Sequence, residues 1–159
     1  MQRRYIKPAN LIEYFNKTPR LGVLSTSSAD GRVDSAVFGS PQMIDEKTVI
    51  AASANNRTFA NLKENPHAMY MILGQCLDFP KETNMNMEQG SSVMDWKGIR
   101  VYMKLKEYAT SGELLDMIRS QAANFVGEEG AKMIYAALTF EVYEVRPLVD
   151  FGQGWEKSI

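Results

Sequence analysis

The segment AASANNRTFANLKENP, residues 51–66, places an arginine and a threonine where an apolar run gives way to a short helix. If Asn56 caps that helix, Arg57 and Thr58 occupy its first two positions, whose backbone N–H groups have no partner within the helix. The helix dipole adds partial positive charge there, and the Arg57 guanidinium offers a planar fork that suits phosphate oxygens. The pattern indicates a phosphate-binding site, although a plain asparagine-capped surface helix with an incidental arginine has the same spacing.

Small side chains end the strand before this helix, and they would let a flat ligand approach the backbone; they are Ala51, Ala52, Ser53 and Ala54. Other catalytic chemistry is sparse. His67 is the only histidine, and we see no Ser-His-Asp arrangement around it. A single histidine also argues against a histidine-rich metal site, so we expect no bound metal. We expect His67, directly after Pro66, to be structural. The single cysteine, Cys76, excludes an intramolecular disulfide and is typical of a reducing compartment.

Hydrophobic periodicity and turn residues predict the elements that would position this segment. Asn10 caps a helix that begins at Leu11, and Thr110 with Glu113 has the spacing of a second capping box before a longer helix through Leu114, Leu115, Ile118, Ala122 and Phe125. Strands are predicted over residues 21–26, 32–39, 48–53, 68–73, 99–109 and 138–145, and the phosphate helix over residues 57–64. The first two strands flank an Ala29-Asp30-Gly31 turn, which is a strong hairpin signal. Residues 75–95 show no periodicity.

The order of these elements favours a largely antiparallel sheet, because tight turns join several strands and few long helices interrupt them. About six strands in a chain of 159 residues would most economically close into a barrel. We therefore predict a mainly β (α+β) fold, with a barrel of about six antiparallel strands and flanking helices. The whole chain, residues 1–159, is expected to be a single domain.

Composition narrows the possible functions. The hydrophobic share is 45%, the charged share 23% and the formal net charge −1. These values are ordinary for a globular protein and argue against a nucleic-acid partner or an anionic membrane surface. No apolar run approaches the roughly 20 residues of a membrane-spanning helix, and the first residues lack the apolar core of a signal peptide. We expect a cytoplasmic protein.

The run LGVLSTSSADGRVDSAVFGSPQMIDEKTVIAASANNRTFANLKENPHAMYMIL, residues 21–73, resembles the pyridoxamine 5′-phosphate oxidase-related FMN-binding proteins, whose fold is the split β-barrel. The resemblance implies that the FMN phosphate is held where the third strand meets the short helix, by Asn56, Arg57, Thr58 and Asn61. It implies that the flavin ring lies along Ser35, Ala36, Val37 and Phe38, near Ala52 and Ser53. The family forms homodimers in which the partner subunit closes the flavin site. The segment WKGIRV stands where partner-side contacts arise, so Lys97, Gly98 and Trp96 are further candidates.

Two departures shape the functional prediction. The oxidases proper carry a second basic residue where this chain has Thr58, and they end in a segment containing Arg and Pro, whereas this chain ends in FGQGWEKSI. The nearer resemblance is to the small FMN-binding proteins of the same fold. It implies an FMN-binding flavoprotein, an oxidoreductase that exchanges electrons or hydride with a small molecule or a redox partner. The alternatives are a deazaflavin-dependent reductase of the same fold and a non-enzymatic flavin- or nucleotide-binding protein.

Overall fold

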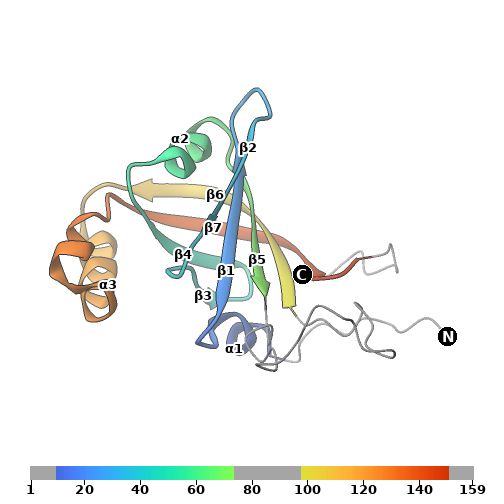
Figure 1. Cartoon of the computed structure of the whole chain (residues 1–159), viewed down its shortest axis with the longest axis horizontal. Coiled ribbons are helices and arrows are strands. Elements are labelled where there is room, and N and C mark those ends of the chain that lie inside the picture. The colour runs from blue at the N-terminus through green and yellow to red at the C-terminus, as the bar shows by residue number, and fades with distance from the viewer. Residues whose placement is uncertain (1–9, 74–97, 151–159) are drawn as a thin grey trace, which may run out of the picture.

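The computed structural model describes residues 10–73 and 98–150 of the chain (Figure 1). The elements in chain order are α1 (Leu11–Asn16), β1 (Leu21–Ser27), β2 (Val33–Val37), β3 (Gln42–Asp45), β4 (Thr48–Ser53), α2 (Arg57–Glu64), β5 (His67–Leu73), β6 (Gly98–Ala109), α3 (Glu113–Lys132) and β7 (Ala136–Pro147). The candidates Trp96 and Lys97, like Cys76 and most of residues 75–95, lie outside the described residues.

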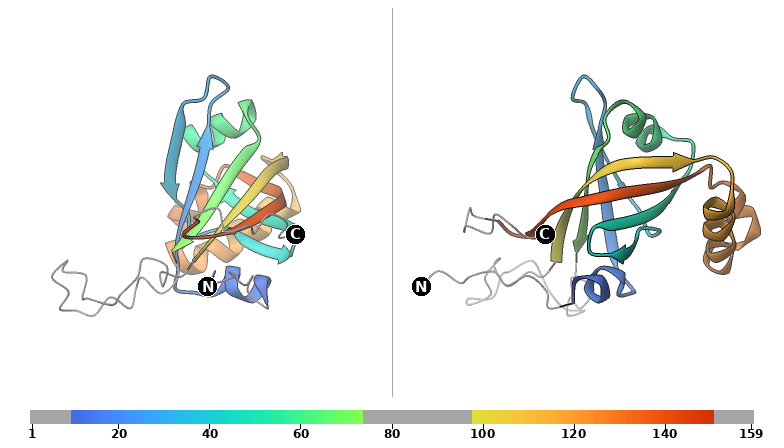
Figure 2. Two further views of the ribbon diagram at one scale, coloured as in Figure 1. Left: turned by 90° about the vertical axis from the view of Figure 1, so that its right-hand side faces the viewer. Right: turned by 180° about the vertical axis from the view of Figure 1, so that it is seen from behind.

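All seven described strands belong to one antiparallel sheet in the order β2-β1-β5-β6-β7-β4-β3. The prediction of an antiparallel sheet is confirmed. The strand that the sequence did not indicate is β3, which pairs with β4 across the Asp45–Lys47 turn. The sheet curls strongly (Figure 2), and β2 and β3 are its two edge strands.

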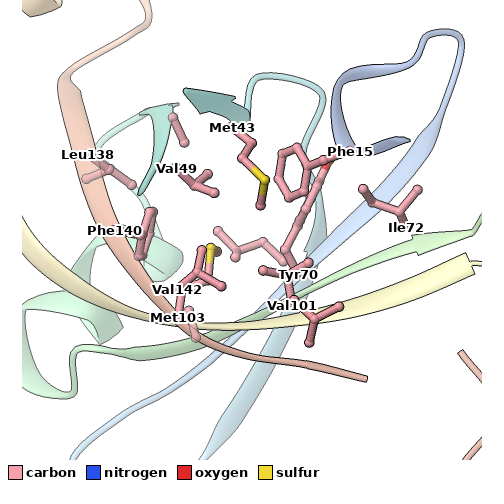
Figure 3. Packing of buried hydrophobic residues seen from close by; sticks show 14 of the residues in the cluster. Phe15, Met43, Val49, Tyr70, Ile72, Val101, Met103, Leu138, Phe140 and Val142 are labelled. Atoms are coloured by element: carbon pink, nitrogen blue, oxygen red, sulfur yellow. The ribbon is translucent and has the colours of Figure 1, made fainter. Parts of the chain in front are cut away.

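The core fills the inside of the curled sheet. Alternate residues of β1, β5, β6 and β7 point inward, among them Leu24, Tyr70, Val101 and Phe140, each at most 1% exposed (Figure 3). Helix α1 covers one end of this core with Leu11 and Phe15, which are fully buried. This packing explains the alternation at the start of the 99–109 segment, because Ile99, Val101 and Met103 point into the core while Arg100, Tyr102 and Lys104 point to the other face of the sheet.

The short helix α2 and the long helix α3 lie outside the sheet, at different places along it (Figure 1). The capping-box prediction at Thr110 is wrong: the N-cap of α3 is Gly112, with φ of 105° and no side-chain cap. A kink at Gly127, with φ of 74°, divides α3 into two helical pieces. Among the helices of residues 10–73 and 98–150, none is long and apolar enough to cross a membrane.

Candidate functional site

The start of α2 has the predicted capping geometry. The Asn56 Oδ1 atom accepts a hydrogen bond from the amide of Phe59 at 3.1 Å, and the Asn56 carbonyl accepts one from Ala60 at 3.0 Å. The two amides before these, at Arg57 and Thr58, have no recorded acceptor among the described residues. The first turn of α2 contains no acidic residue. Two unpaired N–H groups and the positive end of the helix dipole are therefore available to an anion.

The side chains at this helix start divide into one exposed group and two buried ones. Arg57 is exposed and forms no ion pair with any residue of the described part. Thr58 is only 2% exposed, so its backbone amide is better placed for an exposed ligand than its hydroxyl. Asn61 is also buried, and its side-chain amide donates to the Thr26 hydroxyl at 3.1 Å. Asn61 thus fastens α2 to β1, while Arg57 carries the accessible charge.

The residues predicted to lie under the flavin ring alternate along β2. Ser35 and Val37 are exposed, and Ala36 and Phe38 are half-buried, as the strand period of two requires. The Ser35 hydroxyl lies 2.8 Å from that of Ser25 on the neighbouring strand. A flat ring cannot cover all four side chains, because successive ones point to opposite faces. It can lie along the strand's outer edge, since β2 is an edge strand in the described sheet.

The end of β2 meets the end of β4 through Ser40. The Ser40 hydroxyl accepts from the Ala52 amide at 3.0 Å and donates to the Ala52 carbonyl at 3.2 Å. The side chain of Ala52 itself packs under Leu115 of α3, and Ser53 is 2% exposed. Ala52 and Ser53 therefore offer the site their backbone rather than their side chains. The segment from Phe38 to Pro41, which we call the β2–β3 connector, lies next to this backbone.

Gly98 lies far from the start of α2 within one protomer. It begins β6, where it pairs with Leu73, and α2 contacts the other end of the same strand, where Phe59 and Tyr108 have ring centroids 5.1 Å apart. A strand of 12 residues spans up to about 36 Å. The structure thus brings together β2, β4 and the start of α2, but leaves Gly98 at the opposite end of β6.

Sequence reasoning missed the residues that fix the β2–β3 connector. The Tyr70 hydroxyl donates to the Phe38 carbonyl at 2.6 Å. The Arg20 guanidinium donates to the Gly39 carbonyl at 3.2 Å, and also to the carbonyls of Pro41 and Phe15. Burial raises the pKa of Tyr70, with Arg20 opposing that rise, so this hydroxyl is a proton donor at neutral pH. Nothing in the local sequence around Arg20 or Tyr70 signals these contacts, which join distant segments.

The outer face of the sheet carries a patch of apolar side chains on β2, β1 and β5. Val33 and Val37 are 84% and 71% exposed. The register sets Val37 beside Val23, and Val23 beside Met71, in one row across the three strands. We call the large apolar side chains that are exposed or half-buried on this face of the three strands the outer apolar face. It comprises Leu21, Val23, Val33, Val37, Met69, Met71 and Leu73.

Charged side chains continue the outer face on β6 and β7. Asp150 forms ion pairs with Arg100 at 3.0 Å and with Arg146 at 2.9 Å, and Arg146 also pairs with Glu144. His67 places its Nδ1 atom 3.3 Å from the hydroxyl of Tyr143 on this face. Within residues 10–73 and 98–150 no group of three His, Cys, Asp or Glu side chains is placed to hold a metal ion.

Comparison with known proteins identifies the fold. No family model matches the sequence, and no curated protein is significantly similar to it. An FMN-binding protein from Syntrophomonas wolfei is 25% identical, with a TM-score of 0.68 over 88% of this chain and 84% of that one. An F420 reductase is 12% identical, with a TM-score of 0.58 over 86% and 97% of the two chains. The heme storage protein HutZ from Vibrio cholerae is 16% identical, with a TM-score of 0.57 over 89% and 95%.

These similarities confirm the resemblance predicted from residues 21–73. The chain has the split-barrel fold of the pyridoxamine 5′-phosphate oxidase-like proteins. The solved structures that share this fold include proteins named for FMN, for F420 and for heme. The choice among these ligands therefore depends on the site.

Proposed function

We propose that this protein binds FMN and acts as an oxidoreductase on a small molecule or a redox partner. One observation carries the proposal: the start of α2 presents two backbone amides and the Arg57 guanidinium, none of them paired within residues 10–73 and 98–150, with no acidic side chain in its first turn. Such a helix start attracts a phosphate through its dipole, its N–H donors and a full positive charge. The FMN-binding protein of Syntrophomonas wolfei, which shares the fold, supports the same assignment.

The described residues fit the two ends of FMN. The amides of Arg57 and Thr58 and the Arg57 side chain would hold the phosphate, and the junction of β2 with β4 would hold the ring. FMN, when bound, supplies one- or two-electron chemistry, so the protein needs only to bind, orient and tune it. No side-chain acid or base is required for simple electron or hydride transfer, which agrees with the sparse titratable chemistry near α2.

The same proposal includes a homodimer formed through the outer apolar face. Contiguous apolar surface of this kind commonly marks an interface. The position of Gly98 supports the dimer, because Gly98 lies at the far end of β6 from α2 in its own protomer. A second protomer could place its own 97–98 segment at the ring site, and the flavin would then lie at the subunit interface.

A deazaflavin remains the strongest alternative cofactor, because F420 also carries a phosphate group and an F420 reductase shares the fold. Haem is less suited to this place. It requires an axial ligand, and His67, the only histidine, follows the C-terminal end of α2 and bonds Tyr143 on the outer face. A carrier that binds flavin without turnover would use the same α2 start.

The visible spectrum of the purified protein tests the proposal. We expect a yellow protein whose extracted ligand has the absorption and mass of FMN, and apo-protein that regains the spectrum on titration with FMN. A ligand with the spectrum of F420 would select the deazaflavin alternative. A protein that is colourless and binds neither cofactor, or that takes up only haem, would overturn the proposal. Bleaching of the bound flavin by reduced nicotinamide nucleotides would separate a reductase from a carrier.

A further inference from the structure

Arg20 is a half-buried cation that has no anionic partner among the described residues. Its guanidinium donates to the carbonyls of Phe15, Gly39 and Pro41, and it stacks against two rings, 5.3 Å from the centroid of Phe15 and 5.7 Å from that of Tyr70. Its Nε atom is buried and has no hydrogen-bond partner. Partial burial of a cation that only carbonyl dipoles balance costs free energy. A role for the contacts of Arg20 would account for that cost.

The contacts of Arg20 and Tyr70 fall on one short segment, the β2–β3 connector. Tyr70 donates a hydrogen bond to the carbonyl of Phe38, and Arg20 donates to the carbonyls of Gly39 and Pro41. Because Arg20 and Tyr70 lie against each other, the first two of these carbonyls point to the same side. Tyr70 lies beside Phe15 in the core, with ring centroids 5.4 Å apart (Figure 3).

A trans peptide directs its C=O and its N–H in opposite directions. The amide that follows the Phe38 carbonyl is that of Gly39, and the amide that follows the Gly39 carbonyl is that of Ser40. Both N–H groups must therefore point away from Arg20 and Tyr70. Gly39 and Ser40 are exposed, and no acceptor for either amide is recorded in the described residues. A Cβ added at Gly39 would meet nothing within 4 Å, so the connector has open space beside Gly39.

The open side of the connector is the ring site proposed above. The Ser40 hydroxyl joins the connector to the Ala52 amide and carbonyl, so the two outward amides adjoin the end of β4. Reduction of a flavin adds electron density to the nitrogen and carbonyl edge of its ring. Fixed N–H donors aimed at that edge stabilise the reduced form more than the oxidised form, because they need no reorganisation when the charge develops.

We infer that Arg20 and Tyr70 are positioning residues that turn the amides of Gly39 and Ser40 toward the cofactor ring and thereby raise its reduction potential. This inference rests on the proposed function. Gly22 leaves the space that the Tyr70 hydroxyl occupies, because a Cβ on Gly22 would lie 1.8 Å from the Tyr70 hydroxyl oxygen. The amide of Phe38 also donates to the Gly22 carbonyl at 2.9 Å, which fixes the connector's first residue.

The test measures the reduction potential of bound FMN together with the affinity for oxidised FMN. Tyr70→Phe removes one hydroxyl and keeps the ring, and Arg20→Lys keeps the charge but loses the fork that spans two carbonyls. We expect each variant to lower the ratio of affinities for reduced over oxidised FMN about tenfold, which is a fall of about 30 mV for a two-electron couple. Gly39→Pro deletes one of the two donors outright and should cause a fall of similar size.

Two exposed or remote positions supply matched controls. Tyr108→Phe removes a hydroxyl at the α2 end of β6, away from the β2–β3 connector, and Arg32→Lys alters an arginine that is 84% exposed in the β1–β2 hairpin. Both should keep the wild-type potential. Thermal unfolding of each apo-protein shows whether a variant is folded, and Tyr70→Phe and Gly39→Pro decide the matter if Arg20→Lys does not fold.

The outcomes separate the inference from the proposed function. If wild-type protein binds no FMN, the proposed function fails first. If wild-type protein binds FMN but folded Tyr70→Phe and Gly39→Pro keep the control potential, the positioning role is refuted and the contacts are only structural. Amide exchange gives a readout that does not depend on redox chemistry. The Gly39 and Ser40 amides should exchange rapidly in apo-protein and become protected with FMN, and equal exchange in both states would also overturn the inference.

Discussion

Removal of the Arg57 side chain should weaken FMN binding by about an order of magnitude. A unit charge about 4 Å from a phosphate oxygen gains about 1 kcal/mol in bulk water and about 4 kcal/mol at the effective dielectric constant of a protein surface. Mutational values for hydrogen bonds to charged groups fall between these limits, at about 1.5–3 kcal/mol. Arg57 is exposed, so we take the lower end of that range. Arg57→Ala should therefore raise the Kd for FMN about tenfold.

Isothermal titration of apo-protein with FMN measures this change, and Lys63→Ala supplies the matched control. Lys63 lies in the last turn of the same helix, six residues from Arg57 and so about 9 Å along the axis. Lys63→Ala removes the same charge as Arg57→Ala, but from the end of the helix where the dipole disfavours anions. Its effect should be less than twofold at 0.15 M salt, where the Debye length is about 8 Å.

Two results would refute the placement of the phosphate. Equal Kd values for wild type and Arg57→Ala would show that the guanidinium does not contact the ligand. Equal losses in Arg57→Ala and Lys63→Ala would show that only net charge matters. Riboflavin, which lacks the phosphate, gives a further check, because its affinity should be nearly the same in wild type and Arg57→Ala.

Further predictions concern the cap, the interface, the core and the buried tyrosine. Asn56→Ala should lower the free energy of unfolding by about 1 kcal/mol through loss of the N-cap, whereas Asn56→Asp should keep that stability and still weaken FMN binding by repelling the phosphate; chemical denaturation and titration read the two effects separately. Val37→Glu, on the outer apolar face, should convert a dimer into monomers in sedimentation velocity without a large change in secondary structure, and an unchanged mass would exclude this face as the interface. Gly22→Ala should destabilise the fold by about 1–3 kcal/mol in denaturant melts, because the added methyl overlaps Tyr70; wild-type stability would contradict the packing. The pKa of Tyr70 is raised by burial, so this group contributes stability that is fully present below pH 10 and is lost as the pH rises through its folded-state value; Tyr70→Phe should lack that alkaline loss in a pH series of thermal melts.

The anchor of the candidate site could be predicted because its signals are local. Asn56 caps α2 through a bond to Phe59, three residues along the chain, and Arg57 follows from the same register. The β1–β2 hairpin was predictable for the same reason, since Gly31 adopts φ of 85° at an Asp-Gly turn. In each case the deciding hydrogen bonds and dihedral angles involve residues within a few positions of one another.

Other elements escaped prediction because their patterns are short or interrupted. Strand β3 has four residues, of which only Met43 is buried, so it shows no alternation to detect. The helical spacing that included Phe125 holds through Ala122, which is half-buried, but fails at Phe125, which is 89% exposed and lies two residues before the kink at Gly127. Phe125 thus lies at the end of the first helical piece of α3, and a pattern counted along one continuous helix does not show where that piece ends.

The ring end of the site depends on contacts across the sheet, which a single sequence does not reveal. Ser40 reaches Ala52 because β3 folds back beside β4. Tyr70 on β5 reaches the carbonyl of Phe38, at the end of β2, across the one strand that lies between them, β1. The residues that orient this backbone are 19 to 32 positions away from their targets at Gly39 and Phe38. Residue types there, an arginine and a tyrosine, are common enough that only the fold gives them a role.

This division between a local anchor and a distant support has a functional consequence. The phosphate of a bound flavin does not change on reduction, so Arg57 would bind both redox states equally and set affinity without altering the potential. The amides of Gly39 and Ser40 would face the part of the ring whose charge does change, so Tyr70 and Arg20 would alter the ratio of the two affinities. Mutations at the two ends should therefore separate in a double-mutant cycle: Arg57→Ala and Tyr70→Phe should be additive in the affinity for oxidised FMN, while the shift in potential should come from Tyr70→Phe alone.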